Sequence, residues 1–367
     1  MKKEITYLYP ATQDSVRIQK FAKFFAQRNY AQRFIGWKRY RDKEYVDDKF
    51  VSINYLVKGG GDGNRILPFL YLLFMLKLFF VLLFNSKWTR DKIVIAINLE
   101  TAFVVYLVSH FRRVYFIYDI WDELAISHTF PPIVVKFIKN LDNKVRKRSS
   151  LYIHVDDNRI SEIDSSNKNY VIIYNSPYDY MDRNQSNNHE NAFAVTGWLN
   201  NTRGLSSILK FAKDNSLIKF YIVGEFIDDF MKTSFLKLKN IEYHHFMPQE
   251  ALFSLISQVR GIFSLYDPSI EINRLAASNK LYDAMMLGIP VIVNSGIGAA
   301  QMVESEQIGY VVNYEYDMTW NILSYFDEKK VTKLGNNGRN IYMERFEFSN
   351  MMETKLYPIL ATKADEI

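Results

Sequence analysis

Apolar runs alternate with amphipathic stretches along most of this chain. In its first half, the runs at residues 5–9, 92–98 and 114–118 are typical of strands buried in a sheet. The stretches at 16–27 and 101–109 have the spacing of helices with one apolar side. Because strands and helices alternate at this rhythm, the pattern predicts a parallel α/β sheet. Further elements are expected in this half as strands over 34–37, 51–56, 151–155 and 170–174 and a helix over 131–141.

The second half repeats this rhythm. A helix is expected to begin at residues 278–279 and to end at Gly288, which suits the position after a helix C-terminus. A last helix over 349–360 has one apolar side. Strands are expected over 192–197, 219–223, 241–246, 261–266 and 290–293, with helices over 205–214 and 250–258. The pattern therefore predicts a second α/β unit.

A polar stretch separates the two halves. Residues 175–191 contain five Asn and no Val, Ile or Leu, so no core element is expected there. At 367 residues the chain is too long for one ordinary core. We predict an N-terminal domain over 1–178, completed by residues 349–367, a linker over 179–191, and a C-terminal domain over 192–348.

One segment raises the question of a membrane. Residues 66–84 are apolar except for Lys77, and their length approaches that of a transmembrane helix. Pro68 near the start and Lys77 near the middle count against a span. A core helix and a helix that docks in the lipid interface are the other two interpretations.

Charge is distributed unevenly. The net charge is +6, but residues 1–180 carry 28 Lys and Arg against 18 Asp and Glu, whereas the remainder carries 18 against 22. A basic first half suits an anionic membrane or a phosphate-bearing substrate, and no nucleic-acid motif accompanies it. The dense basic run Lys144–Arg148 is either the solvated end of a helix or a lipid contact. We predict no nucleic-acid partner.

Metal sites are not expected from the residue types. The chain has no cysteine, which excludes disulfides and thiolate metal sites and fits a reducing compartment. His244 and His245 are adjacent on a predicted strand, so they point to opposite faces. We predict no metal and no cofactor.

The predicted helix at 279 carries the most specific chemistry. A helix that starts from a polar loop directs unpaired N–H groups and a positive dipole end at its surroundings, which suits phosphate. Ser278 and Asn279 fit its first positions, Lys280 adds a positive charge, and Asp283 lies one turn further on. These residues describe a clamp for a nucleoside diphosphate, with Asp283 able to accept ribose hydroxyls. The alternative is a plain cap, a solvated lysine and a surface acid.

The stretch from Asn279 through Asp283 to Ile292 resembles the nucleotide-sugar signature of GT-B glycosyltransferases of the family 4-like group. Asp283 stands where that family usually has Glu, and Leu275 stands where many retaining members have a second Glu. The resemblance implies a GT-B fold of two parallel-sheet domains facing a cleft, with the C-terminal helix crossing back to the first domain.

The resemblance also implies an activity, transfer of a sugar from a nucleotide-diphosphate donor to a hydroxyl of a glycan or lipid-linked acceptor. Catalysis is expected to be metal-independent and of hexosyltransferase type, in the synthesis of a bacterial surface polysaccharide such as a capsule or an O-antigen. The enzyme is expected in the cytoplasm, peripheral on the inner face of the cell membrane. Residues 66–84 and Lys144–Arg148 are the expected membrane contacts.

Matching the motifs position by position implies the site residues. The loop from Gly197 to Gly204 resembles the family's diphosphate loop, which makes Arg203 a donor contact. Glu225 lies in the turn after a predicted strand. Met247 follows the strand whose end usually contacts the nucleotide base in that family, and Glu271 lies in a loop that could reach the transferred sugar. The implied donor-binding residues are Gly197, Arg203, Glu225, Met247, Glu271, Ser278, Asn279, Lys280 and Asp283.

The acidic turn after residue 118 is the expected catalytic element. Trp121 takes the place of the family's usual His, so Asp122 or Asp119 is the candidate base. Asp122 could instead only cap the following helix. Two other functions remain open for the whole chain: a nucleotide-sugar 2-epimerase of the same fold, and a non-catalytic scaffold that binds nucleotide sugars.

Overall fold

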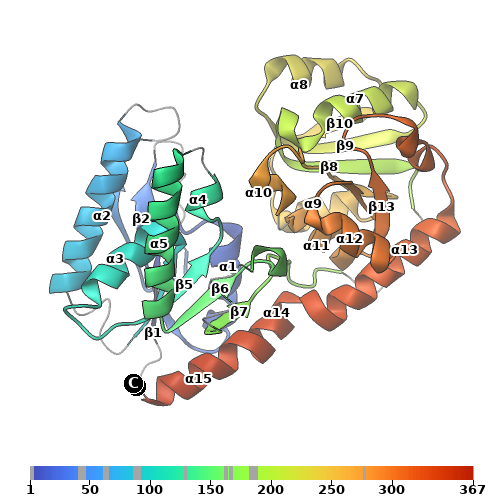
Figure 1. The fold of residues 1–367 in the computed structure, drawn as a ribbon. Coiled ribbons are helices and arrows are strands. Elements are labelled where there is room, and N and C mark those ends of the chain that lie inside the picture. Colours follow the sequence, from blue (N-terminus) through green and yellow to red (C-terminus); the bar gives the residue numbers. More distant parts are fainter. Residues whose placement is uncertain are drawn as a thin grey trace. The chain divides into compact units, whose positions relative to one another are not determined.

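The computed structural model describes residues 4–39, 47–60, 66–85, 92–127, 130–160, 164, 168–181, 189–275 and 278–366. The chain forms two compact units (Figure 1). Unit 1 comprises Met1–Tyr174 and Met352–Ile367, and unit 2 comprises Asn175–Met351. Most of the predicted linker, residues 182–188, lies outside the described residues.

Unit 1 is built on a fully parallel sheet in the order β3-β2-β1-β4-β5-β6-β7. The central strands are apolar throughout, as the sequence indicates, because helices cover both faces. The strand bounds are β1 Glu4–Leu8, β2 Ala31–Lys38, β3 Ser52–Lys58, β4 Ile93–Ile97, β5 Tyr115–Ile120, β6 Leu151–His154 and β7 Tyr170–Ile172.

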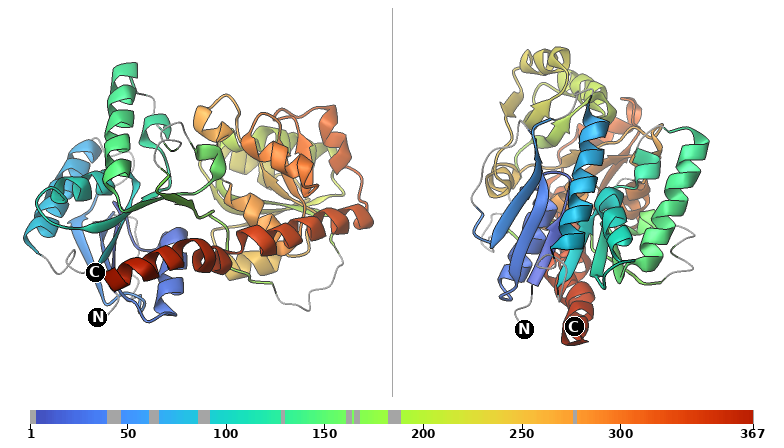
Figure 2. Two further views of the ribbon diagram at one scale, coloured as in Figure 1. Left: turned by 60° about the horizontal axis from the view of Figure 1, so that its bottom comes forward. Right: turned by 90° about the vertical axis from the view of Figure 1, so that its left-hand side faces the viewer.

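The helices of unit 1 form two layers. Residues of α2 (Leu67–Phe84), α3 (Asn98–Val108) and α5 (Pro132–Arg148) share one apolar core with the sheet. The other layer holds α1 (Val16–Ala26) and the C-terminal α15 (Tyr357–Glu366), which meet where the rings of Phe24 and Tyr357 lie 6.0 Å apart (Figure 2). The predicted return of the C-terminal helix to the first unit is confirmed.

Unit 2 has a second parallel sheet in the order β10-β9-β8-β11-β12-β13. One face packs on α7 (Leu205–Asp214), α8 (Asp229–Leu236) and η4 (Met318–Leu323). The strands are β8 Ala192–Leu199, β9 Lys219–Phe226, β10 Ile241–His244, β11 Ile262–Ser264, β12 Val291–Asn294 and β13 Gly309–Val312. Other helices of this unit include α9 Gln249–Ile256, α10 Glu271–Arg274, α11 Asn279–Leu287, α12 Gly298–Ser305 and α13 Glu328–Ile341.

The predicted pair of parallel α/β domains is thus confirmed, with local differences. The helix expected from residue 101 begins at Asn98, and strand β13 was not predicted. The short helix α4, which follows the acidic turn, spans Leu124–Ser127. In place of the single last helix expected over 349–360, the chain has α14 (Phe348–Met351), the π-helical segment η6 (Met352–Leu356) and the start of α15. A second π-helical segment, η5 (Tyr342–Phe346), precedes them.

Candidate functional site

Two glycine turns lie side by side at the carboxyl edge of the sheet in unit 2. Gly197 in β8 has φ 96° and Gly224 in β9 has φ 146°, conformations that L side chains rarely adopt. The two residues are partners in the parallel register. A Cβ on Gly224 would lie 1.9 Å from the carbonyl oxygen of Gly197, so no side chain fits there. The carboxyl edge of a parallel sheet is where such folds bind ligands.

Lys280 reaches this edge from α11. Its Nζ lies 3.5 Å from the position that a Cβ would take on Gly197. The ammonium group therefore sits against the bare backbone of the β8 turn. Lys280 and Gly197, separated widely in the sequence, are brought together as the resemblance implies.

Arg203 supplies a second cation, from the short helix η3 (Asn201–Arg203). The Asn200 side chain accepts a hydrogen bond from the backbone N–H of Thr202 at 3.0 Å and fixes the start of that turn. The Arg203 guanidinium carbon lies 3.9 Å from the ring centroid of Tyr266, and Lys280 Nζ lies 6.0 Å from the same centroid. Tyr266, which sequence reasoning missed, thus links the two cations.

Neither of these two positive charges has an acidic partner among the residues that the structure describes. Within the part of the chain that the structure describes, neither Arg203 nor Lys280 forms an ion pair, and the Arg203 Nη1 atom is buried without a hydrogen-bond partner. A buried guanidinium nitrogen left unpaired is costly in free energy. The arrangement is suited to an anion that accepts charge-assisted hydrogen bonds.

The start of α11 differs from expectation in one respect. Ser278 holds the N-cap position, but its side chain does not cap the helix, so the interpretation of this hydroxyl as a cap is wrong. Its Oγ lies 2.5 Å from Ser264 Oγ on β11, and it is 2% exposed. Asn279 is exposed as the first residue of α11. The terminus therefore presents backbone N–H groups that no serine cap occupies.

The other predicted donor residues lie on α11, at the end of β9, after β10 and on α10. Asp283, half-buried on α11, is close enough to Tyr342 for its charge to help burial raise the pKa of that phenol. Glu225 Oε1 lies 2.7 Å from His245 Nδ1. Met247 is half-buried after β10, and Glu271 is exposed at the first position of α10. No direct contact joins Glu271 to Lys280 or Arg203 among the described residues.

In unit 1 the predicted base Asp119 is a structural anchor. It is 2% exposed, and its two oxygens accept from Arg17 Nη2 at 2.9 Å and Arg17 Nε at 3.0 Å. The indole N–H of Trp121 donates a third bond to Asp119 Oδ2 at 2.6 Å. Arg17 Nη1 also donates to the carbonyl of Ile173 at 2.9 Å. A carboxylate committed to three donors is poorly placed to accept a proton from a substrate.

Asp122 has the opposite character. Its side chain is 58% exposed, and its contact among the described residues is with Arg159 Nη1, 3.4 Å from Oδ1. Within these residues its carboxylate accepts no hydrogen bond from an N–H of α4, which counts against the simple capping interpretation. Of the two candidate bases, the geometry favours Asp122.

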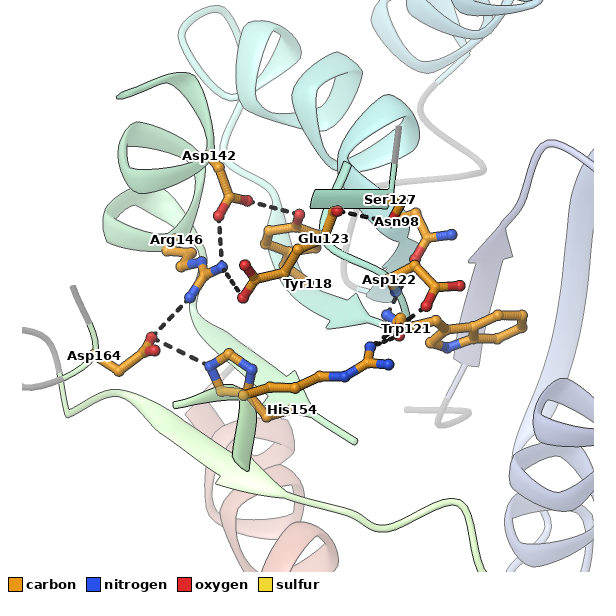
Figure 3. Close-up of polar contacts among 11 residues, drawn as sticks. Asn98, Tyr118, Trp121, Asp122, Glu123, Ser127, Asp142, Arg146, His154 and Asp164 are labelled. Carbon is orange, nitrogen blue, oxygen red and sulfur yellow. Dashed lines mark hydrogen bonds and ion pairs between the residues drawn. The ribbon is translucent and has the colours of Figure 1, made fainter. Parts of the chain in front are cut away.

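The turn that carries Asp122 is held from three directions (Figure 3). Asn98, the first residue of α3 directly after β4, has φ 61°, and its side-chain oxygen accepts from the backbone N–H groups of Trp121 at 3.0 Å and Asp122 at 3.3 Å. Arg159 donates to the carbonyl of Trp121. A left-handed non-glycine residue at a strand end is a strained position that often accompanies function. Only the place of Asn98 at the end of an apolar strand could have drawn attention to it.

Glu123 provides the third support, through Arg146 (Figure 3). Arg146 Nη2 lies 3.2 Å from Glu123 Oε1 and 2.6 Å from Asp142 Oδ2, and its Nη1 lies 2.9 Å from Asp164 Oδ1. These carboxylates raise the pKa of Arg146 above its usual range, against the effect of burial. His154 Nε2 is 3.2 Å from Asp164 but without hydrogen-bond geometry. The network fixes the turn from behind.

Two comparisons with known proteins find no match: no known protein-family profile fits the chain, and no curated protein resembles it in sequence. Solved structures do resemble it. HepE from Anabaena, in complex with UDP and glucose, has a TM-score of 0.71 and 14% identity over 98% of this chain and 100% of that one. WaaG, a glycosyltransferase involved in lipopolysaccharide biosynthesis, has a TM-score of 0.65 and 13% identity over 99% of both chains.

A UDP-N-acetylglucosamine 2-epimerase is also similar, with a TM-score of 0.63 and 8% identity over 99% of this chain and 98% of that one. At these identities the likeness establishes the fold, and the chain has the GT-B fold that its sequence predicts. The same fold in a transferase and an epimerase leaves the activity to be argued from the site.

Proposed function

We propose that this protein is a glycosyltransferase that takes a sugar from a nucleoside-diphosphate donor and transfers it to a hydroxyl of a glycan or lipid-linked acceptor. The observation that carries the proposal is a pair of cations at the ring of Tyr266, Arg203 and Lys280, for which the described part of the chain offers no acidic partner. Lys280 also lies beside Gly197. The structural neighbours HepE, solved with UDP and with UDP-glucose, support a donor of this class.

In this reaction the bond between the anomeric carbon of the sugar and the diphosphate oxygen breaks, and a bond from that carbon to the acceptor oxygen forms. The leaving diphosphate gains negative charge, which Arg203, Lys280 and the N-terminus of α11 stabilise electrostatically. Asp283 accepts hydrogen bonds from the ribose. Asp122 takes the proton that the acceptor hydroxyl loses. Hexosyl transfer, metal independence and the absence of a cofactor are further parts of the proposal.

The proposed acceptor environment is an anionic membrane surface. The helix α2 is long and apolar enough to cross a membrane, and 17% of that window is buried in the protein. It shows a buried stripe of Phe74, Leu78 and Leu82 on one side. Its other side exposes an apolar stripe, with exposed fractions of 48–63% at its members Phe69, Leu72, Leu76 and Phe80. A helix with one side against the core and the other bare suits a position in the lipid interface.

The proposed basic contribution keeps part of the predicted run Lys144–Arg148 and adds two lysines from the first half of α5. Within the run Lys144–Arg148, Arg146 is buried in the network with Asp142 and Asp164, and Arg148 donates to the carbonyl of Ser109 at 2.9 Å. Lys144 and Lys147 remain exposed, and so are Lys136 and Lys139 further along α5, beside the exposed Ile133 and Phe137. We place the enzyme on the cytoplasmic face of the membrane, in surface polysaccharide synthesis such as that of a capsule or an O-antigen.

The proposal is tested by incubating the purified protein with individual UDP-, GDP-, CDP-, ADP- and dTDP-sugars, with and without membrane extract as acceptor. Release of the nucleoside diphosphate that depends on the extract, together with sugar incorporated into lipid, supports transfer. Conversion of the donor sugar to its 2-epimer without any acceptor would instead establish the epimerase. Binding of a nucleotide sugar without transfer or epimerisation would support the third alternative, a non-catalytic scaffold.

A further inference from the structure

Two aromatic rings meet above the end of the central strand β4 in unit 1. Tyr9 follows β1 and Trp121 follows β5, and these strands flank β4 in the sheet. The ring centroids of Tyr9 and Trp121 lie 4.7 Å apart, with 45° between the planes. Both residues are half-buried. They form one aromatic surface at the carboxyl edge, next to Asp122 in the chain.

Trp121 is fixed through all of its polar groups. Its indole N–H donates to Asp119 at 2.6 Å, its backbone N–H donates to Asn98 at 3.0 Å, and its carbonyl accepts from Arg159. Each polar group of Trp121 thus already has a partner among the described residues, and the ring face is the surface it offers to a ligand. In Figure 3 the indole and the Asp122 carboxylate both extend to the side of the turn away from Arg146.

The charges around these rings select the kind of ligand. Burial is the main cause that raises the pKa of Tyr9 to about 12, and the nearby charges of Asp122 and Glu100 raise it further while Arg39 opposes them. Arg39 is engaged with the hydroxyl of Tyr71, at 3.0 Å from Nη2. Arg159 is engaged with the turn itself. Cations committed in this way, beside two carboxylates, do not favour a phosphate.

We propose that Tyr9 and Trp121 form a stacking platform for a neutral sugar ring of the acceptor, whose hydroxyl is presented to Asp122. The C–H face of a pyranose packs on aromatic faces, while its peripheral hydroxyls donate to carboxylates. The inference rests on the proposed function and makes it more specific: the enzyme extends an existing saccharide. An earlier sugar or sugar-phosphate transfer must therefore supply its acceptor.

The test uses saturation-transfer NMR on the full-length protein with neutral methyl glycosides of glucose, galactose, mannose, rhamnose and N-acetylglucosamine, and with farnesyl phosphate as the charged probe. At least one glycoside is expected to receive saturation at its ring C–H protons. Trp121→Leu should weaken the binding of that glycoside by about five- to tenfold, the effect expected from the loss of one aromatic stacking contact. Tyr9→Leu should weaken it similarly, whereas Tyr9→Phe retains the ring and the binding.

Several results would overturn the platform: no glycoside binds, the signal survives both leucine variants, or farnesyl phosphate binds in a manner that depends on Trp121. Thermal unfolding checks that each variant is folded. If Trp121→Leu is unfolded, the comparison of Tyr9→Leu with Tyr9→Phe tests the platform instead. UDP binding, measured on the same samples, separates a failure of the stacking platform from a failure of the proposed glycosyltransferase function. The leucine variants should keep it, since the donor residues lie in unit 2, and its absence from the wild type would count against the proposed function itself.

Discussion

Lys280 Nζ lies 3.5 Å from the point where a Cβ would stand on Gly197, so the lysine rests on a backbone that has no side chain to displace it. The helix that carries Lys280 and the strand that carries Gly197 are far apart in the sequence. Their meeting places a positive charge at the carboxyl edge of the second sheet. The predictions for the donor site follow from this contact.

Gly197→Ala should weaken UDP binding about tenfold or more, because the new methyl group meets Lys280 and the alanine resists φ 96°. Some stability, about 1 kcal/mol, should also be lost from the backbone conformation. Gly288→Ala is the matched control, with φ 66° but no nearby atom closer than 3.8 Å to the new Cβ. Calorimetry and thermal unfolding should show both variants destabilised and only Gly197→Ala impaired in binding. Equal affinity of Gly197→Ala and Gly288→Ala for UDP would show that Gly197 is not part of the donor site.

Arg17→Met should cost about 3–5 kcal/mol of unfolding free energy, because it leaves the buried carboxylate of Asp119 without its cation. The side chains of this pair are 2% and 3% exposed. Arg345→Met, which breaks the exposed pair with Glu306, is the control and should cost about 0–1 kcal/mol. Urea unfolding followed by circular dichroism measures both. A small loss in Arg17→Met would mean that Asp119 is not anchored in this way.

Asp122→Asn should reduce turnover by about 100-fold or more while UDP binding is unchanged, because the amide cannot accept the acceptor's proton. The control is Asp48→Asn, an exposed carboxylate of the same unit. Turnover is measured as acceptor-dependent release of nucleoside diphosphate. Normal turnover in Asp122→Asn would leave that residue no role as a base.

Removal of the exposed apolar stripe from α2 should release the protein from lipid. Leu76→Ser with Phe80→Ser is expected to lower the fraction bound to phosphatidylglycerol vesicles about tenfold, since two large apolar groups lose their burial. The control, Ile227→Ser with Phe230→Ser, removes side chains of unit 2 that are 65% and 77% exposed. Co-sedimentation at moderate salt is the measurement. If both double variants bind alike, α2 does not dock in lipid.

The sequence predicted the alternating fold well because buried parallel strands leave a local signal, as in the apolar run of β4. It also singled out Lys280 and Arg203 through their motifs, and the fold brings both to the ring of Tyr266. Their role as donor contacts stays a prediction. It could not distinguish Asp119 from Asp122, because the partner that anchors Asp119 is Arg17, 102 residues away. That contact exists only once the sheet has formed.

The basic run at Lys144–Arg148 illustrates the same limit. A run of charges on a helix must place some members inward, and Arg146 is the inward one since Asp164 and Glu123 lie where it points. Tyr266 was missed for a related reason. An aromatic residue at a strand end has no local sign that two cations from other loops will lie over its ring.

The central claim, that Arg203 and Lys280 bind a nucleoside diphosphate, is tested most directly by calorimetric titration with UDP, GDP, CDP, ADP and dTDP. The wild type should bind one of them clearly better than the others. Lys280→Ala and Arg203→Ala should each weaken that binding about tenfold or more, the size of one lost charge-assisted contact. Lys239→Ala, an exposed lysine before β10, should not. No binding by any diphosphate, or equal binding by all variants, would contradict the account.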